Sequence, residues 1–297
     1  MGTTCIGRWN FASARRTLRA VPRPRLRRRV DLQKTLFLLP NMITLASVFC
    51  GFQSLRTAAE SFAFRERGLP NEAADGFFHA ALFLVYAVFF DTMDGRVARA
   101  TKTQSSFGLQ LDSLADALSF GVAPGVLVYL WSLHHLGLVG QLVGFFFAAC
   151  AVVRLARFNV LSMDDTGRPT KPSKYIVGLP SPGAAGMLVS LILANHASSV
   201  RLEQSRFSWA ILGTTILFGT LMVSTIKFRS FKDLHPNPRT VGVVLFGVLS
   251  SAYVSYVRGP AFVLVWLLAI YVSIGLVESA WTLGRRLSGR AVEDPVV

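Results

Sequence analysis

Hydrophobic runs long enough to cross a bilayer recur along most of this 297-residue sequence. About 20 apolar residues in an α-helix span the hydrocarbon core, and short polar stretches separate runs of this kind. We place the runs at 36–55, 76–98, 109–133, 136–158, 179–197, 207–227, 239–257 and 260–282. The pattern predicts an all-α integral membrane protein with about eight transmembrane helices and no internal repeat.

Composition agrees with a bilayer environment. Hydrophobic residues make up 52% of the chain and charged residues only 16%, whereas soluble domains carry about 25% charged residues. The three cysteines are far apart and lack CxxC spacing, so neither a zinc site nor a disulfide framework is indicated. One membrane domain is therefore expected rather than two soluble domains.

Positive charge is concentrated before the first hydrophobic run. Residues 1–29 contain nine arginines and no acidic residue. Such an arm attracts anionic lipid headgroups; no nucleic-acid reading module accompanies it, so we expect no nucleic-acid partner. A mitochondrial-type presequence is the weaker alternative. We expect a basic cytoplasmic arm over 1–34, a polytopic membrane domain over 35–284 and a cytoplasmic tail over 285–297.

The distribution of basic residues predicts the orientation of the spans. Cytoplasmic segments carry an excess of Lys and Arg in membrane proteins. With the N-terminus in the cytoplasm and eight spans, 25 of the 31 basic residues fall on the cytoplasmic side. We therefore expect a multi-pass protein of the cytoplasmic (inner) membrane with both termini inside.

Four carboxylates interrupt the second and third runs. Asp91 and Asp94 are three residues apart, and Asp112 and Asp116 are four apart, so each pair shares a helix face. About 15 apolar-rich residues precede Asp91 and about 17 follow Asp116, which puts both pairs near the cytoplasmic boundary at 1.5 Å per residue. The short polar turn between them predicts antiparallel helices, with all four carboxylates in one pocket.

Charges inside a span cost a few kcal/mol each, so four together point to function. Carboxylate oxygens are suitable ligands for Mg²⁺, Mn²⁺ or Ca²⁺. Three interpretations are open on the residues alone: metal-dependent chemistry, an ion pathway, and an Asp–Arg network that braces two helices. Small residues at Gly95, Ala98 and Gly108 leave space for a ligand beside a metal, although close helix packing also uses such residues.

The whole motif resembles the signature of the CDP-alcohol phosphotransferase family. It reads Asp-x-x-Asp-Gly-x-x-Ala-Arg from Asp91 to Arg99, then eight residues, then Gly-x-x-x-Asp-x-x-x-Asp from Gly108 to Asp116. All eight defining positions are present. The segments LPNMITLASVFCGF, RLARFN and GLPSPGAAG are in turn similar to the bacterial and archaeal-type phosphatidylserine synthases within that family.

The resemblance implies a fold, a reaction and site residues. The fold would be a core of six helices, often in a homodimer, here followed by two further spans. The reaction would transfer a phosphatidyl group from CDP-diacylglycerol to L-serine with release of CMP, at a cytoplasmic site between membrane lipids and water. The implied metal, Mn²⁺ or Mg²⁺, would be held by Asp91, Asp94, Asp112 and Asp116, with Asp116 also the general base. The CDP moiety would be bound by Gly95, Ala98, Arg99 and Gly108.

Recognition of the acceptor alcohol is the least constrained part of this interpretation. Arg154 and Arg157 lie at the predicted cytoplasmic end of the fourth span, where arginine can hold a carboxylate or phosphate or anchor the helix among headgroups. Glycerol 3-phosphate or inositol phosphate in place of serine is an alternative within the family. A divalent-cation transporter is the alternative outside it, although a transporter predicts acids near mid-membrane and broken helices in both halves.

Overall fold

The computed structural model describes residues 32–101, 103, 105–161, 175–198, 205–229 and 238–287. Almost all of the predicted basic arm (1–34), and most of the predicted C-terminal tail (285–297), lie outside these ranges. The boundaries of the predicted membrane domain remain a prediction.

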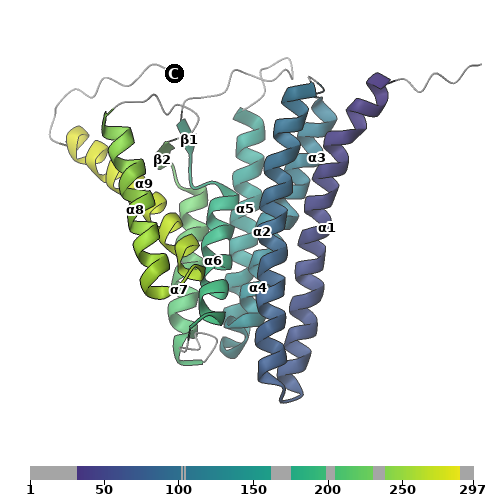
Figure 1. Ribbon diagram of the computed structural model, residues 1–297, viewed down its shortest axis with the longest axis vertical. Helices are drawn as coiled ribbons and strands as arrows, with labels where there is room; N and C mark the ends of the chain where they lie inside the picture. The colour runs from purple at the N-terminus through teal and green to yellow at the C-terminus, as the bar shows by residue number, and fades with distance from the viewer. Residues whose placement is uncertain are drawn as a thin grey trace, which may run out of the picture.

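Helices form nearly all of the described chain, and their order follows the hydrophobic runs (Figure 1). The elements are α1 (Leu32–Glu66), α2 (Pro70–Thr101), α3 (Ser106–Asp116), the π-helical segment η1 (Ala117–Val122), α4 (Ala123–Trp131), the 3₁₀ turn η2 (Leu133–Leu136), α5 (Leu138–Leu161), β1 (Tyr175–Val177), α6 (Ser181–His196), α7 (Ser205–Val223), β2 (Lys227–Arg229), α8 (Pro238–Arg258) and α9 (Ala261–Leu287).

The prediction of an all-α integral membrane protein is confirmed. Within the described ranges, five helical segments are long and apolar enough to cross a membrane: Leu38–Glu66, Pro70–Thr101, Ser106–Trp131, Leu138–Val160 and Ser205–Val223. Each of the eight predicted spans coincides with a helix, but α6 has only 16 residues. The number of spans therefore stays a prediction.

Small residues along α1 allow α2 and η1 to pack closely against it. Thr44, Ser47, Ser54, Ala58 and Ser61 are three, four or seven residues apart, so they share one face of α1, and each is at most 5% exposed. In lipid, small residues let helix backbones approach and let hydroxyl groups bond across the interface. The Ser47 hydroxyl donates to the Ala87 carbonyl oxygen on α2 at 3.2 Å, and the Ser119 hydroxyl of η1 donates to the Ser47 carbonyl oxygen at 3.2 Å.

A short antiparallel sheet joins the end of α7 to the segment before α6. β1 pairs with β2 so that Tyr175 faces Arg229 and Val177 faces Lys227. Gly178 follows β1 with a φ of +82°, and a Cβ there would overlap the Met222 carbonyl oxygen. Glycine is therefore required where these two segments meet.

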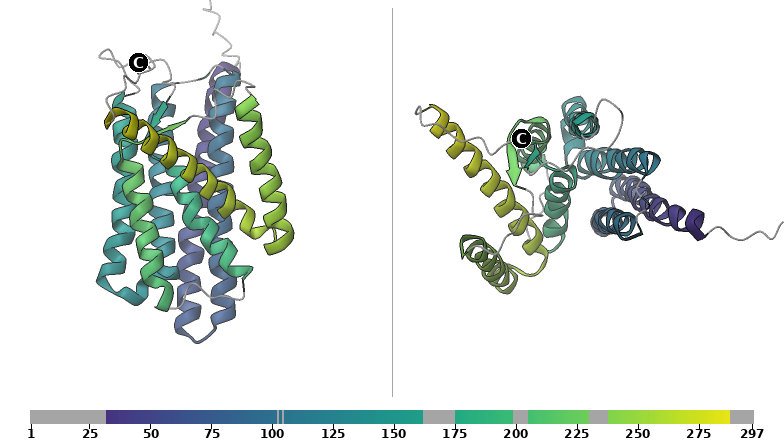
Figure 2. Two further views of the ribbon diagram at one scale, coloured as in Figure 1. Left: turned by 90° about the vertical axis from the view of Figure 1, so that its left-hand side faces the viewer. Right: turned by 90° about the horizontal axis from the view of Figure 1, so that it is seen from above.

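The last two helices stand at one side of the bundle. α9 packs against α6 and α8, and in the views of Figure 2 it crosses the long helices obliquely. The chain reverses between α2 and α3 at the upper end of Figure 1, where α5 also ends. We call this the aspartate end; the opposite end contains the α1–α2 turn, η2 and the start of α7.

Candidate active site

Helices α2 and α3 present the predicted acidic residues at the aspartate end. α2 continues to Thr101, and α3 begins at Ser106 after a turn of four residues. Ser105 caps α3, because its hydroxyl oxygen accepts a hydrogen bond from the Gly108 N–H at 2.9 Å. The cap fixes where α3 starts, and hence the direction in which Asp112 and Asp116 project.

Three of the four aspartates converge on one point. Carboxylate oxygens of Asp91, Asp112 and Asp116 all lie within 4.8 Å of one another, and the three side chains are partly buried. Asp94 lies outside this group of three. It is only 4% exposed, and its Oδ2 atom has no hydrogen-bond partner among the described residues. The predicted convergence is thus observed for three carboxylates, with Asp94 buried one turn further along α2.

This cluster has the chemistry of a divalent-cation site. Three carboxylates this close repel one another unless a positive charge lies among them, and oxygen ligands suit hard divalent cations. Among the described residues, the Oδ2 of buried Asp94 is a further acceptor without a donor, and a bound ion is one partner that satisfies such an atom. The residues present therefore fit a metal.

The backbone of α2 is open beside the acids. A Cβ at Gly95 would meet only the Arg99 guanidinium nitrogens, at 3.7 and 3.9 Å. Arg99 is exposed and folds back over Gly95, while Ala98 is partly buried. Gly108 is more confined, since a Cβ there would lie 3.2 Å from the Ser105 hydroxyl oxygen and 3.5 Å from Asn41 Oδ1.

The two arginines of α5 have different surroundings. Arg154 is 9% exposed, donates to the Ser181 hydroxyl at 2.8 Å, and is near enough to Asp116 for their charges to interact. Its Nε has no hydrogen-bond partner among the residues described. Arg157 instead donates to the carbonyl oxygens of Val223, Val177 and Ser224 at 3.0, 3.1 and 3.3 Å.

The sequence analysis assigned no role to several polar residues that lie beside the site. Ser181 starts α6 and orients Arg154, and the Ser113 hydroxyl donates to Asn159 Oδ1 at 3.0 Å, which ties α3 to α5. Both Ser181 and Asn159 lie in motif segments, but only the fold brings them to the acids. The π-helical turn of η1 directly follows Asp116, and π-turns are frequent at functional sites.

Comparison with known proteins supplies independent information. The model of the CDP-alcohol phosphatidyltransferase family matches residues 37–226, which end before α8 and α9. A CDP-diacylglycerol--serine O-phosphatidyltransferase of Helicobacter pylori is 33% identical over 71% of this chain and 79% of its own length. Proteins of the same name from Mycobacterium tuberculosis (33% identical, 84% of this chain, 79% of the relative) and Methanocaldococcus jannaschii (35%, 66% and 82%) are also similar.

Proposed function

Because the chain belongs to the CDP-alcohol phosphatidyltransferase family, we propose that it transfers a phosphatidyl group from CDP-diacylglycerol to L-serine, giving phosphatidylserine and CMP. The single observation that carries the chemistry is the meeting of Asp91, Asp112 and Asp116 within 4.8 Å. The choice of serine rests on the names of the relatives and on the flanking segments, since a cluster of carboxylates alone does not select an alcohol.

Asp91, Asp94, Asp112 and Asp116 would hold Mg²⁺ or Mn²⁺. When bound, the metal would neutralise the pyrophosphate and favour departure of CMP. The residues of this chain supply the remaining steps. Gly95, Ala98, Arg99 and Gly108 bind the CDP moiety, with the open backbone at Gly95 admitting it and the Arg99 guanidinium available to phosphate.

Asp116 acts as the general base. Its carboxylate accepts the proton of the serine hydroxyl as the serine oxygen bonds to the phosphorus that carries the diacylglycerol. The bond from that phosphorus to the CMP oxygen breaks, and CMP leaves with the electron pair. A carboxylate is a weak base for an alcohol, so positioning and proton transfer concerted with bond formation are what make it effective.

Of the two arginines on α5, we assign Arg154 to binding of the acceptor alcohol. Its buried guanidinium lies beside Asp116 and has an unpartnered Nε, so it can bind the serine carboxylate next to the base. The three carbonyl groups bound by Arg157 give that residue a structural role.

The location suits substrates of mixed character. The protein is a multi-pass membrane protein, and the carboxylates lie in the last part of α2 (Pro70–Thr101) and the first part of the segment Ser106–Trp131, so toward one end of the bundle. With that end at the cytoplasmic face of the inner membrane, soluble serine reaches the site from water while the acyl chains stay among the membrane lipids. We further propose that the protein works as a homodimer and binds no nucleic acid.

Release of CMP by the purified full chain tests this function. CDP-diacylglycerol and Mg²⁺ or Mn²⁺ would be supplied with serine, glycerol 3-phosphate, inositol phosphate or no acceptor. Release with serine alone is expected. Release with a different acceptor would keep the family and overturn the serine assignment.

A divalent-cation transporter is the alternative from another class. The grouping of the acids toward one end of α2 and α3 favours the enzyme. Metal flux into vesicles by folded protein that releases no CMP with any acceptor would instead establish the transporter.

A further inference from the structure

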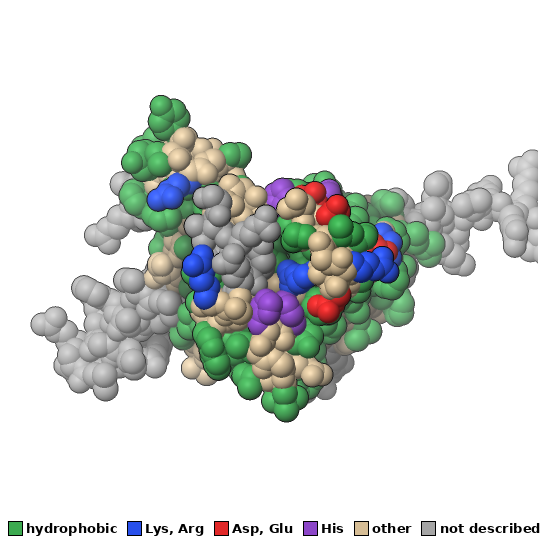
Figure 3. All heavy atoms as spheres, turned by 90° about the horizontal axis from the view of Figure 1, so that it is seen from below, with side chains coloured by type: hydrophobic (Ala, Val, Ile, Leu, Met, Phe, Trp, Pro, Cys, Tyr) green, Lys and Arg blue, Asp and Glu red, His purple; other side chains and the backbone are tan. Residues whose placement is uncertain are grey.

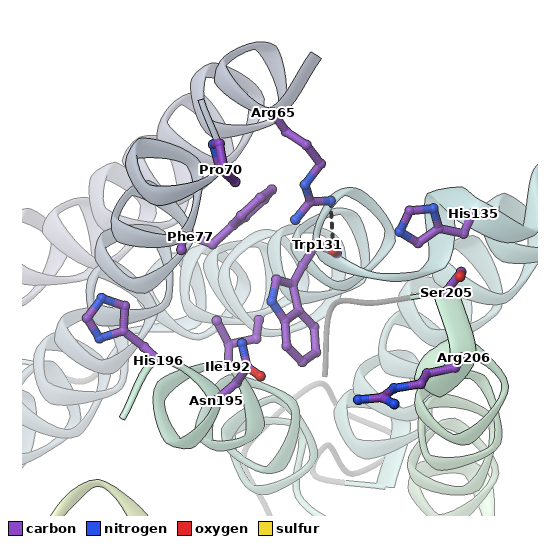
Figure 4. A pocket seen from close by; sticks show the side chains of 11 residues that line it. Arg65, Pro70, Phe77, Trp131, His135, Ile192, Asn195, His196, Ser205 and Arg206 are labelled. Carbon is purple, nitrogen blue, oxygen red and sulfur yellow. Dashed lines mark hydrogen bonds between the residues drawn. The ribbon is translucent and has the colours of Figure 1, made fainter. Parts of the chain in front are cut away.

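A cavity of about 470 Å³ lies at the end of the bundle opposite the aspartates. The end of α1, the start of α2, the end of α4, the end of α6 and the start of α7 surround it (Figure 4). Its volume is within the range of small-molecule sites. This cavity takes no part in the proposed reaction, because the residues of that reaction are at the other end of the bundle.

The polar side chains that line the cavity are basic or neutral. Arg65, His135, His196 and Arg206 contribute to the wall, and no acidic side chain is among the described lining residues. Asp75, which is not among the lining residues, lies with its Oδ1 2.9 Å from His196 Nε2. Viewed from that end, blue and purple side chains gather together, with red side chains beside them (Figure 3).

Arg65 is held in place at one wall. Its NH1 donates to the carbonyl oxygens of Leu130 and Trp131 at 3.0 and 2.9 Å, and its guanidinium lies 4.7 Å from the centre of the Phe77 ring. Figure 4 shows this side chain between the end of α1 and Trp131. A guanidinium already fixed by such contacts loses little conformational entropy when it binds an anion.

Arg206 supplies a second cation from α7. It is exposed and lies 4.7 Å over the ring of Phe207. Next to Arg65, burial lowers the pKa of His134 to about 4, helped by the charges of His135 and Arg65. His134 is therefore neutral at pH 7 and adds no charge beside Arg65.

The inner surface of the cavity is apolar. Trp131 and Ile192 are each 2% exposed, and Phe77 is 1% exposed. The cavity also lies where the apolar parts of the helices end, which is the level of lipid headgroups for a spanning bundle. A ligand that fits this cavity would have a compact anionic group that contacts the arginines and an apolar part that contacts Trp131, Ile192 and Phe77.

We infer that this cavity is a second binding site, which takes a phosphate-bearing anion between Arg65 and Arg206. Arginine pairs with phosphate in a bidentate geometry that few other side chains match. The phosphate belongs either to the headgroup of an anionic phospholipid or to a small soluble phosphate ester.

Equilibrium binding to the full chain in an uncharged detergent tests the inference. The probes are dihexanoyl phosphatidylglycerol, dihexanoyl glycerol without phosphate, glycerol 3-phosphate and inorganic phosphate. Arg206→Gln is the variant, because its exposed side chain can change without disturbing the core. Arg67→Gln is the matched control, since Arg67 is an exposed arginine in the α1–α2 turn that does not line the cavity. Melting temperatures confirm that both variants are folded.

We expect phosphatidylglycerol or the soluble phosphates to bind the parent, dihexanoyl glycerol to bind at least tenfold more weakly, and Arg206→Gln to lose about tenfold in affinity. Binding of the lipid alone identifies a headgroup site, and binding of the soluble phosphates identifies a site for a free ester. Equal affinity in parent and Arg206→Gln overturns the inference, because the phosphate is then held elsewhere. Equal losses in Arg206→Gln and Arg67→Gln overturn it as well, since they indicate surface charge alone. None of these readouts depends on turnover, so failure of the proposed reaction leaves the test intact.

Discussion

Replacing Arg157 with glutamine removes a cation that three backbone carbonyl groups share. The two shorter bonds, to Val223 and Val177, measure 3.0 and 3.1 Å. Hydrogen bonds to a charged group contribute about 1.5–3 kcal/mol each, so loss of the two is expected to destabilise the protein by about 3–6 kcal/mol. At about 2–4 °C per kcal/mol for a chain of this size, the melting temperature should fall by about 6–24 °C.

Arg154→Gln is the matched comparison. Arg154 has a described hydrogen bond to one side-chain hydroxyl, that of Ser181, so its loss should lower the melting temperature less. Loss of a charged donor to serine should instead reduce kcat/KM for serine by about 10- to 100-fold. Turnover per folded Arg157→Gln molecule, assayed below its transition, should stay within about threefold of the parent.

Thermal unfolding in detergent and serine-dependent CMP release, measured on the same preparations, separate the two arginines. The assignment fails if Arg157→Gln melts like the parent and raises the KM for serine as much as Arg154→Gln does. Arg157 would then face the acceptor despite its contacts with the backbone.

Three further predictions concern single positions. Asp116→Asn should reduce CMP release by at least about 100-fold while nucleotide affinity stays within about threefold in equilibrium dialysis; near-normal release would remove Asp116 from the role of base. Gly178→Ala should lower the melting temperature, because a residue at φ +82° costs alanine about 1–2 kcal/mol and the new Cβ overlaps the Met222 carbonyl oxygen; an unchanged melting curve would contradict this. The pKa of His134 is lowered to about 4 in the fold from about 6.5 unfolded, so its stabilising contribution is complete above about pH 6.5 and is lost as pH falls toward 4. The melting temperature of His134→Gln should therefore fall less than that of the parent between pH 7 and pH 5, and parallel falls would refute the assignment.

The parts of the fold that the sequence predicted well are those governed by local pattern. Apolar runs predicted the helices, because lipid requires each span to satisfy its own backbone. Spacing of three and four residues put each pair of aspartates on one helix face, and the short turn before Ser106 brought Asp91 to Asp112 and Asp116.

Other features depend on contacts between distant segments. Arg157 bonds to carbonyl groups up to 67 residues away, so its structural role is invisible in the α5 sequence, where it resembles Arg154. The π-turn after Asp116 arises where Ser119 meets Ser47 of α1. The cavity at the opposite end collects residues from five helices, and no single segment predicts it.

Incorporation of radiolabelled serine into lipid tests the central claim most directly. The purified chain would be given CDP-diacylglycerol, labelled serine and Mn²⁺ or Mg²⁺, beside Asp116→Asn and a sample treated with chelator. We predict labelled phosphatidylserine from the parent alone, with CMP released in equal amount. Labelled lipid from Asp116→Asn at the parent's rate, or none from a folded parent that binds CDP-diacylglycerol, would contradict the account.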